Sequence, residues 1–195
     1  MNSLKNPLTL LSSWRKEEAT LSGMQPLACL STVGLDGFPN ARIVTVKDII
    51  DDTVIITGPL NSRKGAEINN NNKVALTFCC HETNRQIRIQ GIAEQISKVL
   101  ADEYFKERSA SAKAVSIVCH QGQTLTDESI VKQQIAQELA KKMTNSTSLT
   151  RPNTWGGYSI QIKRIEFMQY QDTSFHKRDL YEQVDGHWDH QKLQP

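Results

Sequence analysis

The chain has 195 residues, 38% hydrophobic and 23% charged, which is the composition of an ordinary globular protein with room for one sizeable core. Its 23 basic and 21 acidic residues give a net charge of +2 without a long block of one sign, which argues against nonspecific binding to nucleic acid or membrane surfaces. No stretch approaches the roughly 20 apolar residues of a membrane span, and the N-terminus lacks a secretion signal, so we expect one domain, residues 1–195, in the cytoplasm.

The first 20 residues predict a helix that packs on the body of the protein. Asn6 suits the N-cap and Pro7 the first helical position, and an apolar stripe follows up to about residue 19. Strand-like segments come next, most of them separated by Gly, Asp, Asn or Pro, at residues 27–33, 40–47, 53–57, 73–80 and 85–96. Short strands joined by tight turns predict an antiparallel barrel or sandwich.

The second half of the chain mixes helices with the last strands. Helices are expected at residues 97–108 and 127–143, and in the second an apolar residue recurs at every fourth position from Val131 to Met143. The polar stretch 144–153 predicts a loop. The final strands are expected at residues 158–171, 175–184 and 187–193, with Asp185-Gly186 as the turn of the last hairpin.

The cysteines show neither CxxC spacing nor a neighbouring histidine cluster, so buried thiols are the favoured interpretation and a metal site is a distant second. Cys79 and Cys80 are neighbours, and their side chains should face opposite sides of a strand.

A phosphate site is indicated at Asn61-Ser62-Arg63-Lys64, where a Val/Ile-rich strand gives way to a polar helix-like stretch. Two cations beside a hydroxyl at a helix start can hold a phosphate, because helical N–H groups add partial positive charge and arginine donates in a two-pronged fashion. The alternative is a solvated helix start. However, cations oppose the helix dipole at that end unless an anion is present.

The order of several motifs resembles the pyridoxine/pyridoxamine 5'-phosphate oxidase family. They run from Asn6-Pro7-Leu8-Thr9-Leu10 through Arg42-Ile43-Val44-Thr45-Val46-Lys47, Asn61-Ser62-Arg63-Lys64, Arg85-Gln86-Ile87-Arg88, Trp155-Gly156-Gly157-Tyr158 and Glu166-Phe167-Met168-Gln169 to Leu193-Gln194-Pro195. The resemblance covers nearly the whole chain. It implies an α+β fold with an antiparallel split β-barrel and peripheral helices, a homodimer, and FMN bound at the dimer interface.

The resemblance also implies which residues hold FMN. They are Arg42, Lys47, Arg63, Lys64, Gln86, Gln121 and Arg178; Thr57, one residue before a glycine, is added because it can offer a hydroxyl or backbone donor. Arg42 and Lys47 lie five positions apart, so an undistorted strand would point them to opposite faces. Either a bulge brings them together or they serve different neighbours. The alternative for Arg42 and Lys47 is that they are exposed cations flanking an ordinary strand. The alternative for Gln86 is a polar residue on the outward face of a strand.

The implied substrate-binding residues are Lys47, Tyr104, Arg108 and His176, with His176 near the reacting carbon. Tyr104 and Arg108 sit four apart and share one helix face, where a phenol and a guanidinium can converge on an anion. The alternative is an ordinary surface contact between a tyrosine and an arginine. Lys47, Tyr104 and Arg108 would surround the substrate phosphate. This group usually includes a serine, and Ala112 stands at that place, which removes one hydrogen bond.

Other departures from the family pattern concern the substrate side of the site. The usual Arg-Leu-His-Asp-Arg reads Ser174-Phe175-His176-Lys177-Arg178, so the leading arginine is a serine. Met168 stands where a flavin-contacting tryptophan is usual, and Gly122 follows Gln121 where serine is common.

The sequence therefore predicts an FMN-dependent oxidase. Its expected substrate is a small molecule, a phosphorylated B6 vitamer such as pyridoxamine or pyridoxine 5'-phosphate, and the expected products are pyridoxal 5'-phosphate and hydrogen peroxide. One alternative is a related FMN oxidase with a different substrate, as in phenazine biosynthesis. Another is a protein that binds flavin or pyridoxal phosphate without turnover. No metal, nucleic acid or membrane partner is expected.

Overall fold

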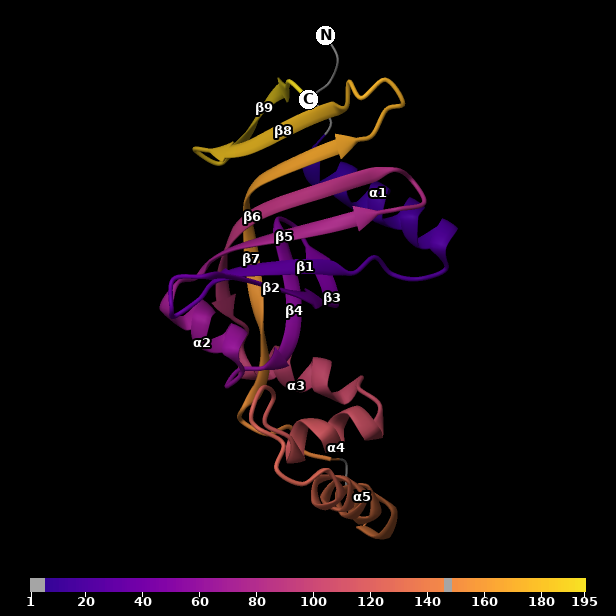
Figure 1. Ribbon diagram of the computed structural model, residues 1–195, viewed down its shortest axis with the longest axis vertical. Helices are drawn as coiled ribbons and strands as arrows, with labels where there is room; N and C mark the ends of the chain where they lie inside the picture. Colours follow the sequence, from indigo (N-terminus) through magenta and orange to yellow (C-terminus); the bar gives the residue numbers. More distant parts are fainter. Residues whose placement is uncertain (1–5, 146–148) are drawn as a thin grey trace.

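The computed structural model describes residues 6–145 and 149–195, and the side chains of residues 142–145 lie outside this description. Its centre is a curled sheet of nine strands (Figure 1), most of them joined as antiparallel neighbours in chain order. The strands are β1 (Ala28–Val33), β2 (Pro39–Val44), β3 (Val46–Ile50), β4 (Thr53–Pro59), β5 (Lys73–Cys80), β6 (Arg85–Gln95), β7 (Trp155–Gln169), β8 (Lys177–Val184) and β9 (His187–Leu193).

The sheet divides at β7, which explains the split form of the barrel. The order is β2-β1-β5-β6-β7-β4-β3, with β8 on β7 and β9 on β8. The first half of β7 pairs with β4 and the second half with β8, while β6 accompanies β7 along its other edge. A bulge at Lys163 of β7, opposite Gln90 and Gly91 of β6, interrupts the pairing of these two strands. A Cβ at Gly91 would lie 2.4 Å from the Gln161 carbonyl oxygen, so only glycine fits this close approach.

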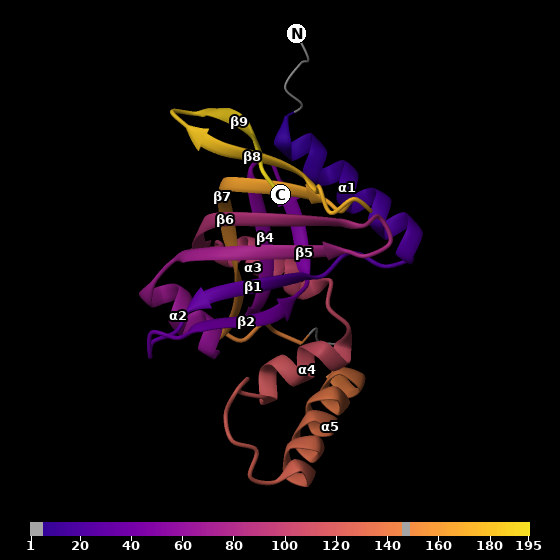
Figure 2. The same ribbon diagram turned by 45° about the horizontal axis from the view of Figure 1, so that its top comes forward.

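Helices surround the barrel without entering it. They are α1 (Pro7–Ser22), α2 (Arg63–Asn70), α3 (Lys98–Lys106), α4 (Ala110–Val118) and α5 (Glu128–Asn145). The Asn6 side chain caps α1 as predicted by accepting from the Leu8 N–H, and Gly23 ends the helix with φ of 73°. Leu11 and Trp14 pack α1 onto the core, with Trp14 edge-on to Phe167. Helices α4 and α5 pair with each other at one end of the molecule (Figure 2).

Two differences from the sequence-based expectations matter for the site. The strand expected at residues 40–47 is two strands, because the chain leaves β2 after Val44 and begins β3 at Val46. Helix α4 was missed, since Ser109 starts a new helix directly after α3 by accepting from the Ala112 N–H. The start of the predicted N-terminal helix segment (residues 1–5) and part of the predicted 144–153 loop (residues 146–148) lie outside the described residues.

The cysteines only partly follow the expectation of buried thiols. Cys80 is buried, Cys29 and Cys119 are half-buried, and Cys79 is exposed on the opposite face of β5, so the buried interpretation is wrong for Cys79. All of them are free thiols. Within residues 6–145 and 149–195, no group of His, Cys, Asp and Glu is arranged to hold a metal. None of the described helices is long and apolar enough to cross a bilayer.

Candidate active site

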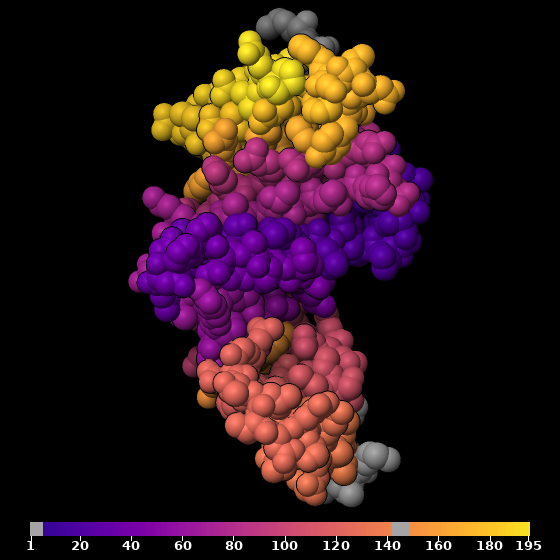
Figure 3. Space-filling model, in the orientation of Figure 1, coloured from indigo at the N-terminus to yellow at the C-terminus, as the bar shows by residue number. Residues whose placement is uncertain are grey.

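A cavity of about 860 Å³ lies between one edge of the barrel and helices α2, α3 and α4. In Figure 3 the surface is hollowed between the purple barrel and the salmon helical region. Five basic residues line the cavity, and its described lining contains no acidic residue. They are Arg42, Lys47, Arg63, Lys64 and Arg108. Thr57, Tyr104 and Gln121 line it too, so most of the residues predicted from the sequence are brought together here.

The start of α2 forms one end of this cavity. Ser62 occupies the N-cap position, but its hydroxyl donates to the Pro59 carbonyl at 2.8 Å and does not cap the helix. The first N–H groups of α2 are therefore left to an external acceptor. Gly65 lets the helix approach the preceding loop, because a Cβ there would lie 1.9 Å from the Leu60 carbonyl oxygen.

Lys64 is the cation in this part of the cavity without an acidic partner among the described residues. Its ammonium group donates to the Ser62 hydroxyl at 3.0 Å and to the Gln121 amide oxygen at 2.8 Å. Burial, and then repulsion from Arg42, lower the pKa of Lys64. A desolvated ammonium that has only neutral acceptors gains most from a bound anion.

Arg42 and Arg63 are instead held by a buried carboxylate. Glu67, fully buried on α2, accepts from Arg42 at 2.8 Å, from Arg63 at 2.9 Å and from the Thr32 hydroxyl at 2.5 Å. Burial alone would raise the pKa of Glu67, but the hydrogen bonds from Thr32, Arg63 and Arg42 outweigh it and lower this pKa to about 2. Arg63 also pairs with Asp36 at 3.1 Å. The network fixes both guanidinium groups beside the start of α2.

Lys47 reaches the cavity because β3 is irregular. The register between β3 and β4 shifts between Val46 and Asp48, and this bulge lets Lys47 line the same cavity as Arg42. The sequence left open a bulge or different neighbours for Arg42 and Lys47. The structure has both a strand break at Thr45 and this bulge, and the two cations line one cavity while they pair with different carboxylates, Glu67 and Glu107. The Lys47 ammonium pairs with Glu107 at 2.5 Å and lies 5.7 Å from the centre of the Tyr104 ring. Burial raises the pKa of Tyr104, as does the charge of Asp48, so the phenol stays protonated as a donor.

Arg108 forms a second cation without an acidic partner in the described chain. Its guanidinium lies 5.1 Å from the centre of the Trp155 ring, and one nitrogen donates to the Ala112 carbonyl and the Ser116 hydroxyl, each at 3.3 Å. The Nε atom is buried without a hydrogen-bond partner. Burial lowers the pKa of Arg108 from its ordinary value. Like Lys64, this group is electrostatically unsatisfied until an anion binds.

Three predicted residues, Gln86, His176 and Arg178, lie outside the cavity. Gln86 and Arg178, both predicted FMN contacts, form a row with Met168 across β6, β7 and β8. Arg178 is bound to the buried Glu166 through Nε at 2.8 Å and Nη2 at 2.6 Å. Gln86 is half-buried and alternates with buried Ile87. This fits both a contact with the flavin and the alternative of a polar residue on the outward face of a strand.

His176 lies near this row, in the turn between β7 and β8. Its Nδ1 atom accepts from the Gln171 N–H at 3.2 Å, and its ring stands edge-on to Tyr170 at 5.1 Å between centres. Ser174 in the same turn has φ of 61°, and Phe175 beside it is 71% exposed. A single chain therefore carries two separate groups of predicted residues.

Sequence reasoning missed several residues that line or support the cavity. Glu67, which supports Arg42 and Arg63 from behind the lining, had no signal beyond its place four residues after Arg63. Ser116 lies in the unpredicted α4, and Trp155 was noted only as part of a family motif. Trp155 is buried, packed against Phe105 at 5.0 Å, and it also walls the cavity beneath Arg108.

Comparisons with known proteins agree with this geometry. Residues 15–142 match the family described as pyridoxamine 5'-phosphate oxidase, and residues 155–195 match the pyridoxine 5'-phosphate oxidase C-terminal dimerisation region. The pyridoxine/pyridoxamine 5'-phosphate oxidase of Flavobacterium psychrophilum is 31% identical over 100% of this chain and 91% of its own. That of Actinobacillus pleuropneumoniae is 33% identical, with the same coverage.

Solved structures give the same fold. The crystal structure of PhzG from Burkholderia lata 383, in complex with tetrahydrophenazine-1-carboxylic acid, has a TM-score of 0.91 at 28% identity and covers 100% of this chain and 95% of that one. A pyridoxamine 5'-phosphate oxidase-related FMN-binding protein from Nostoc punctiforme has a TM-score of 0.79 at 16% identity, over 99% of this chain and 100% of that one, which speaks for the split-barrel fold alone. By its sequence along both matched regions, this chain belongs to the pyridoxamine 5'-phosphate oxidase family.

Proposed function

We propose that the protein is an FMN-dependent oxidase of pyridoxamine or pyridoxine 5'-phosphate, acting as a homodimer. The observation that carries this proposal is the cavity lined by five basic residues and, in its described lining, no acidic one. Such a surface suits two ligands that each carry a phosphate, FMN and the substrate, because a bound anion stabilises each cation that lacks an acidic partner. Localisation in the cytoplasm stays a prediction.

The α2 end of the cavity would take the FMN phosphate. Lys64 has no acidic partner in the described chain, the first N–H groups of α2 are uncapped by Ser62, and Arg63 is fixed beside them by Glu67. Thr57 and Gln121 lie on the same cavity wall. This donor set fits a phosphate dianion, which accepts from several N–H and ammonium groups at once.

The α3–α4 end would take the phosphate of the substrate. Arg108, held over Trp155, and the protonated Tyr104 phenol face this part of the cavity together with Lys47. Ala112 lacks the hydroxyl common in the family. In this chain the Ser116 hydroxyl, one helical turn further along α4, accepts from Arg108.

The second subunit would complete each site. Gln86, Arg178 and His176 lie away from the cavity of their own chain, and β7 to β9 form the region that matches the family's dimerisation segment. In the proposed dimer this row faces the cavity of the partner, where Gln86 and Arg178 would contact the flavin.

Bound FMN would supply the redox chemistry, accepting a hydride from the carbon that bears the amine or alcohol and being reoxidised by oxygen to give hydrogen peroxide. The protein would position the two phosphates and the reacting carbon. Because His176 Nδ1 accepts from the Gln171 N–H, the neutral imidazole carries its proton on Nε2, which is free to donate to the substrate.

A visible spectrum tests this function. The purified protein should show the absorption of bound flavin, and anaerobic pyridoxamine 5'-phosphate should bleach it; air should then restore the colour with formation of hydrogen peroxide. A protein that retains no flavin contradicts the cofactor, whereas a flavin that is never bleached contradicts the substrate.

A related oxidase of a non-phosphorylated acid is the second candidate. The likeness to PhzG, and the substitution of the family's substrate-side arginine and serine by Ser174 and Ala112, favour it. Arg108 would then hold a carboxylate. Bleaching by a tetrahydrophenazine carboxylic acid but not by pyridoxamine 5'-phosphate would select this candidate.

A further inference from the structure

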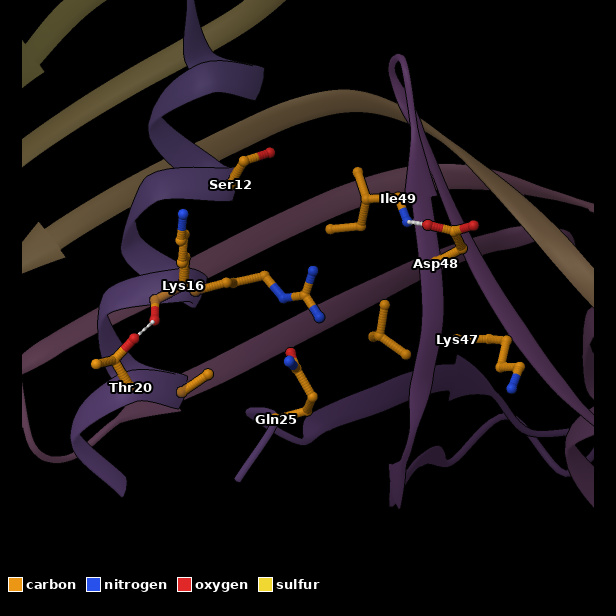
Figure 4. Close-up of a pocket in the computed structure, with 10 residues that line it drawn as sticks. Ser12, Lys16, Thr20, Gln25, Lys47, Asp48 and Ile49 are labelled. Carbon is orange, nitrogen blue, oxygen red and sulfur yellow. Dashed lines mark hydrogen bonds between the residues drawn. The ribbon is translucent and has the colours of Figure 1, made fainter. Parts of the chain in front are cut away.

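A second cavity, of about 660 Å³, lies between α1 and β3 (Figure 4). It shares only Lys47 with the lining of the proposed active site, and Lys47 points away from it, whereas Gln25 and Ile49 point into the space. Its volume is within the range of small-molecule sites, which is about 300 to 1,000 Å³. Neither the proposed FMN site nor the proposed substrate site uses this space.

Arg15 is the unusual group in this cavity. No described residue gives its guanidinium a hydrogen bond or an ion pair, and its Nε atom is buried without a partner. The guanidinium lies 5.4 Å from the centre of the Phe78 ring. Burial lowers the pKa of Arg15, and attraction from Cys80 and Asp48 opposes this effect only in part. The folded protein thus carries a half-buried cation that has no acceptor among the described residues.

The nearby acidic groups are committed elsewhere. On α1, Glu17 pairs with Arg85, and Glu18 accepts from the backbone N–H groups of Glu82 and Thr83. On β3, Asp48 also lines the cavity, but its carboxylate accepts from the Ile49 N–H at 2.8 Å and forms no ion pair with Arg15 among the described residues. The Arg15 guanidinium is therefore open to an acceptor from outside the described chain.

The rest of the lining defines the chemistry of that acceptor. Gln25 and Ser12 offer further hydrogen-bond donors, while Ala19, Val46 and Ile49 give one wall an apolar surface. A guanidinium binds a carboxylate or a phosphate through two parallel hydrogen bonds. The apolar wall and the volume leave room for an organic body attached to that oxyanion.

We propose that the α1–β3 cavity is a binding site for a small organic oxyanion, a carboxylate or a phosphate ester, anchored by Arg15. It is separate from the proposed active site, so it does not depend on the identity of the cofactor or the substrate there.

Calorimetric titration of the purified protein with phenyl phosphate and, separately, with benzoate tests the site. Phenyl phosphate should bind both at Arg15 and at Arg108, and the two probes distinguish a phosphate site from a carboxylate site. Arg15→Gln should weaken one binding event by about tenfold or more, which is the loss of a charge-assisted bidentate contact. Arg108→Gln should weaken the other event. Lys73→Gln, on the exposed start of β5 and outside the lining of both cavities, should change neither to this degree.

Two further measurements keep the test independent of folding. Arg15→Gln should unfold at the same temperature as the unsubstituted protein or higher, because it removes a desolvated cation, and Arg15→Lys should keep part of the affinity. Binding that Arg15→Gln leaves unchanged would overturn the proposal. So would absence of any event beyond the one lost in Arg108→Gln, or a weaker dimer in Arg15→Gln, which would assign Arg15 to a partner subunit.

Discussion

Replacing Lys64 by methionine isolates the cation at the start of α2 from the rest of the fold. Lys64 has only the Ser62 hydroxyl and the Gln121 amide as partners in the described chain, so the substitution breaks no ion pair. Losing a hydrogen bond from a charged group to the FMN phosphate costs about 1.5 to 3 kcal/mol. That corresponds to a roughly 10- to 150-fold higher dissociation constant for FMN.

The stability of the flavin-free protein should move in the other direction. Burial lowers the pKa of Lys64, which means that the folded state disfavours its charge, and methionine fills the same volume without a charge. FMN affinity is measured by quenching of flavin fluorescence and stability by urea unfolding, with Lys73→Met on the exposed start of β5 as the control. An FMN dissociation constant within threefold of that of the control would refute the reasoning.

Three other predictions follow from single contacts. Ser116→Ala should raise the KM for pyridoxamine 5'-phosphate by roughly three- to tenfold without changing FMN retention, because Arg108 loses a hydroxyl that orients its guanidinium toward the substrate phosphate; an unchanged KM in steady-state kinetics would contradict this positioning role. Because the pKa of Glu67 is lowered to about 2 from 4.5, its stabilising effect should be complete above pH 4.5 and disappear as the pH falls toward 2. In urea unfolding, the Glu67→Gln variant should be roughly 3 to 5 kcal/mol less stable than the unsubstituted protein at pH 7, and its stability should change less with pH over this range. Equal dependence of stability on pH in the two proteins would refute the network. Gly65→Ala should displace α2 from the Leu60 carbonyl and lower both the melting temperature and FMN affinity, and retention of both would show that the close approach is not needed.

Local patterns allowed much of the fold to be predicted. The Asn6 cap, the alternation along β5 and β6, and the hairpin turn at Asp185-Gly186 depend on neighbouring residues, and the structure confirms them. The interruption at Thr45 could not be seen, because a strand break and a bulge depend on pairing with β4 and not on local propensity. Helix α4 was missed because only residues 107–109 separate it from α3, too short a break to stand out in the sequence.

The site shows the same division between local and long-range information. The motif around Arg63 and Lys64 predicted a helix start, and the structure has α2 begin there. Both residues line the cavity together with Lys47 and Arg108. Sequence could not reveal that the buried Glu67 also ties up Arg42, since that contact joins β2 to α2 across the fold, whereas the Glu67–Arg63 pair is local to α2. The roles of these residues toward FMN and the substrate stay predictions.

The most direct test of the proposed active site is a mixed dimer. One subunit carries Lys64→Met, and the other carries Arg178→Met with Glu166→Gln, so that no buried carboxylate is left unpaired. Each homodimer should bind FMN weakly. The heterodimer, isolated through two different affinity tags, should bind one FMN with nearly normal affinity, because one of its interface sites receives only unsubstituted residues. A heterodimer that binds FMN as weakly as both homodimers would contradict a site shared between subunits.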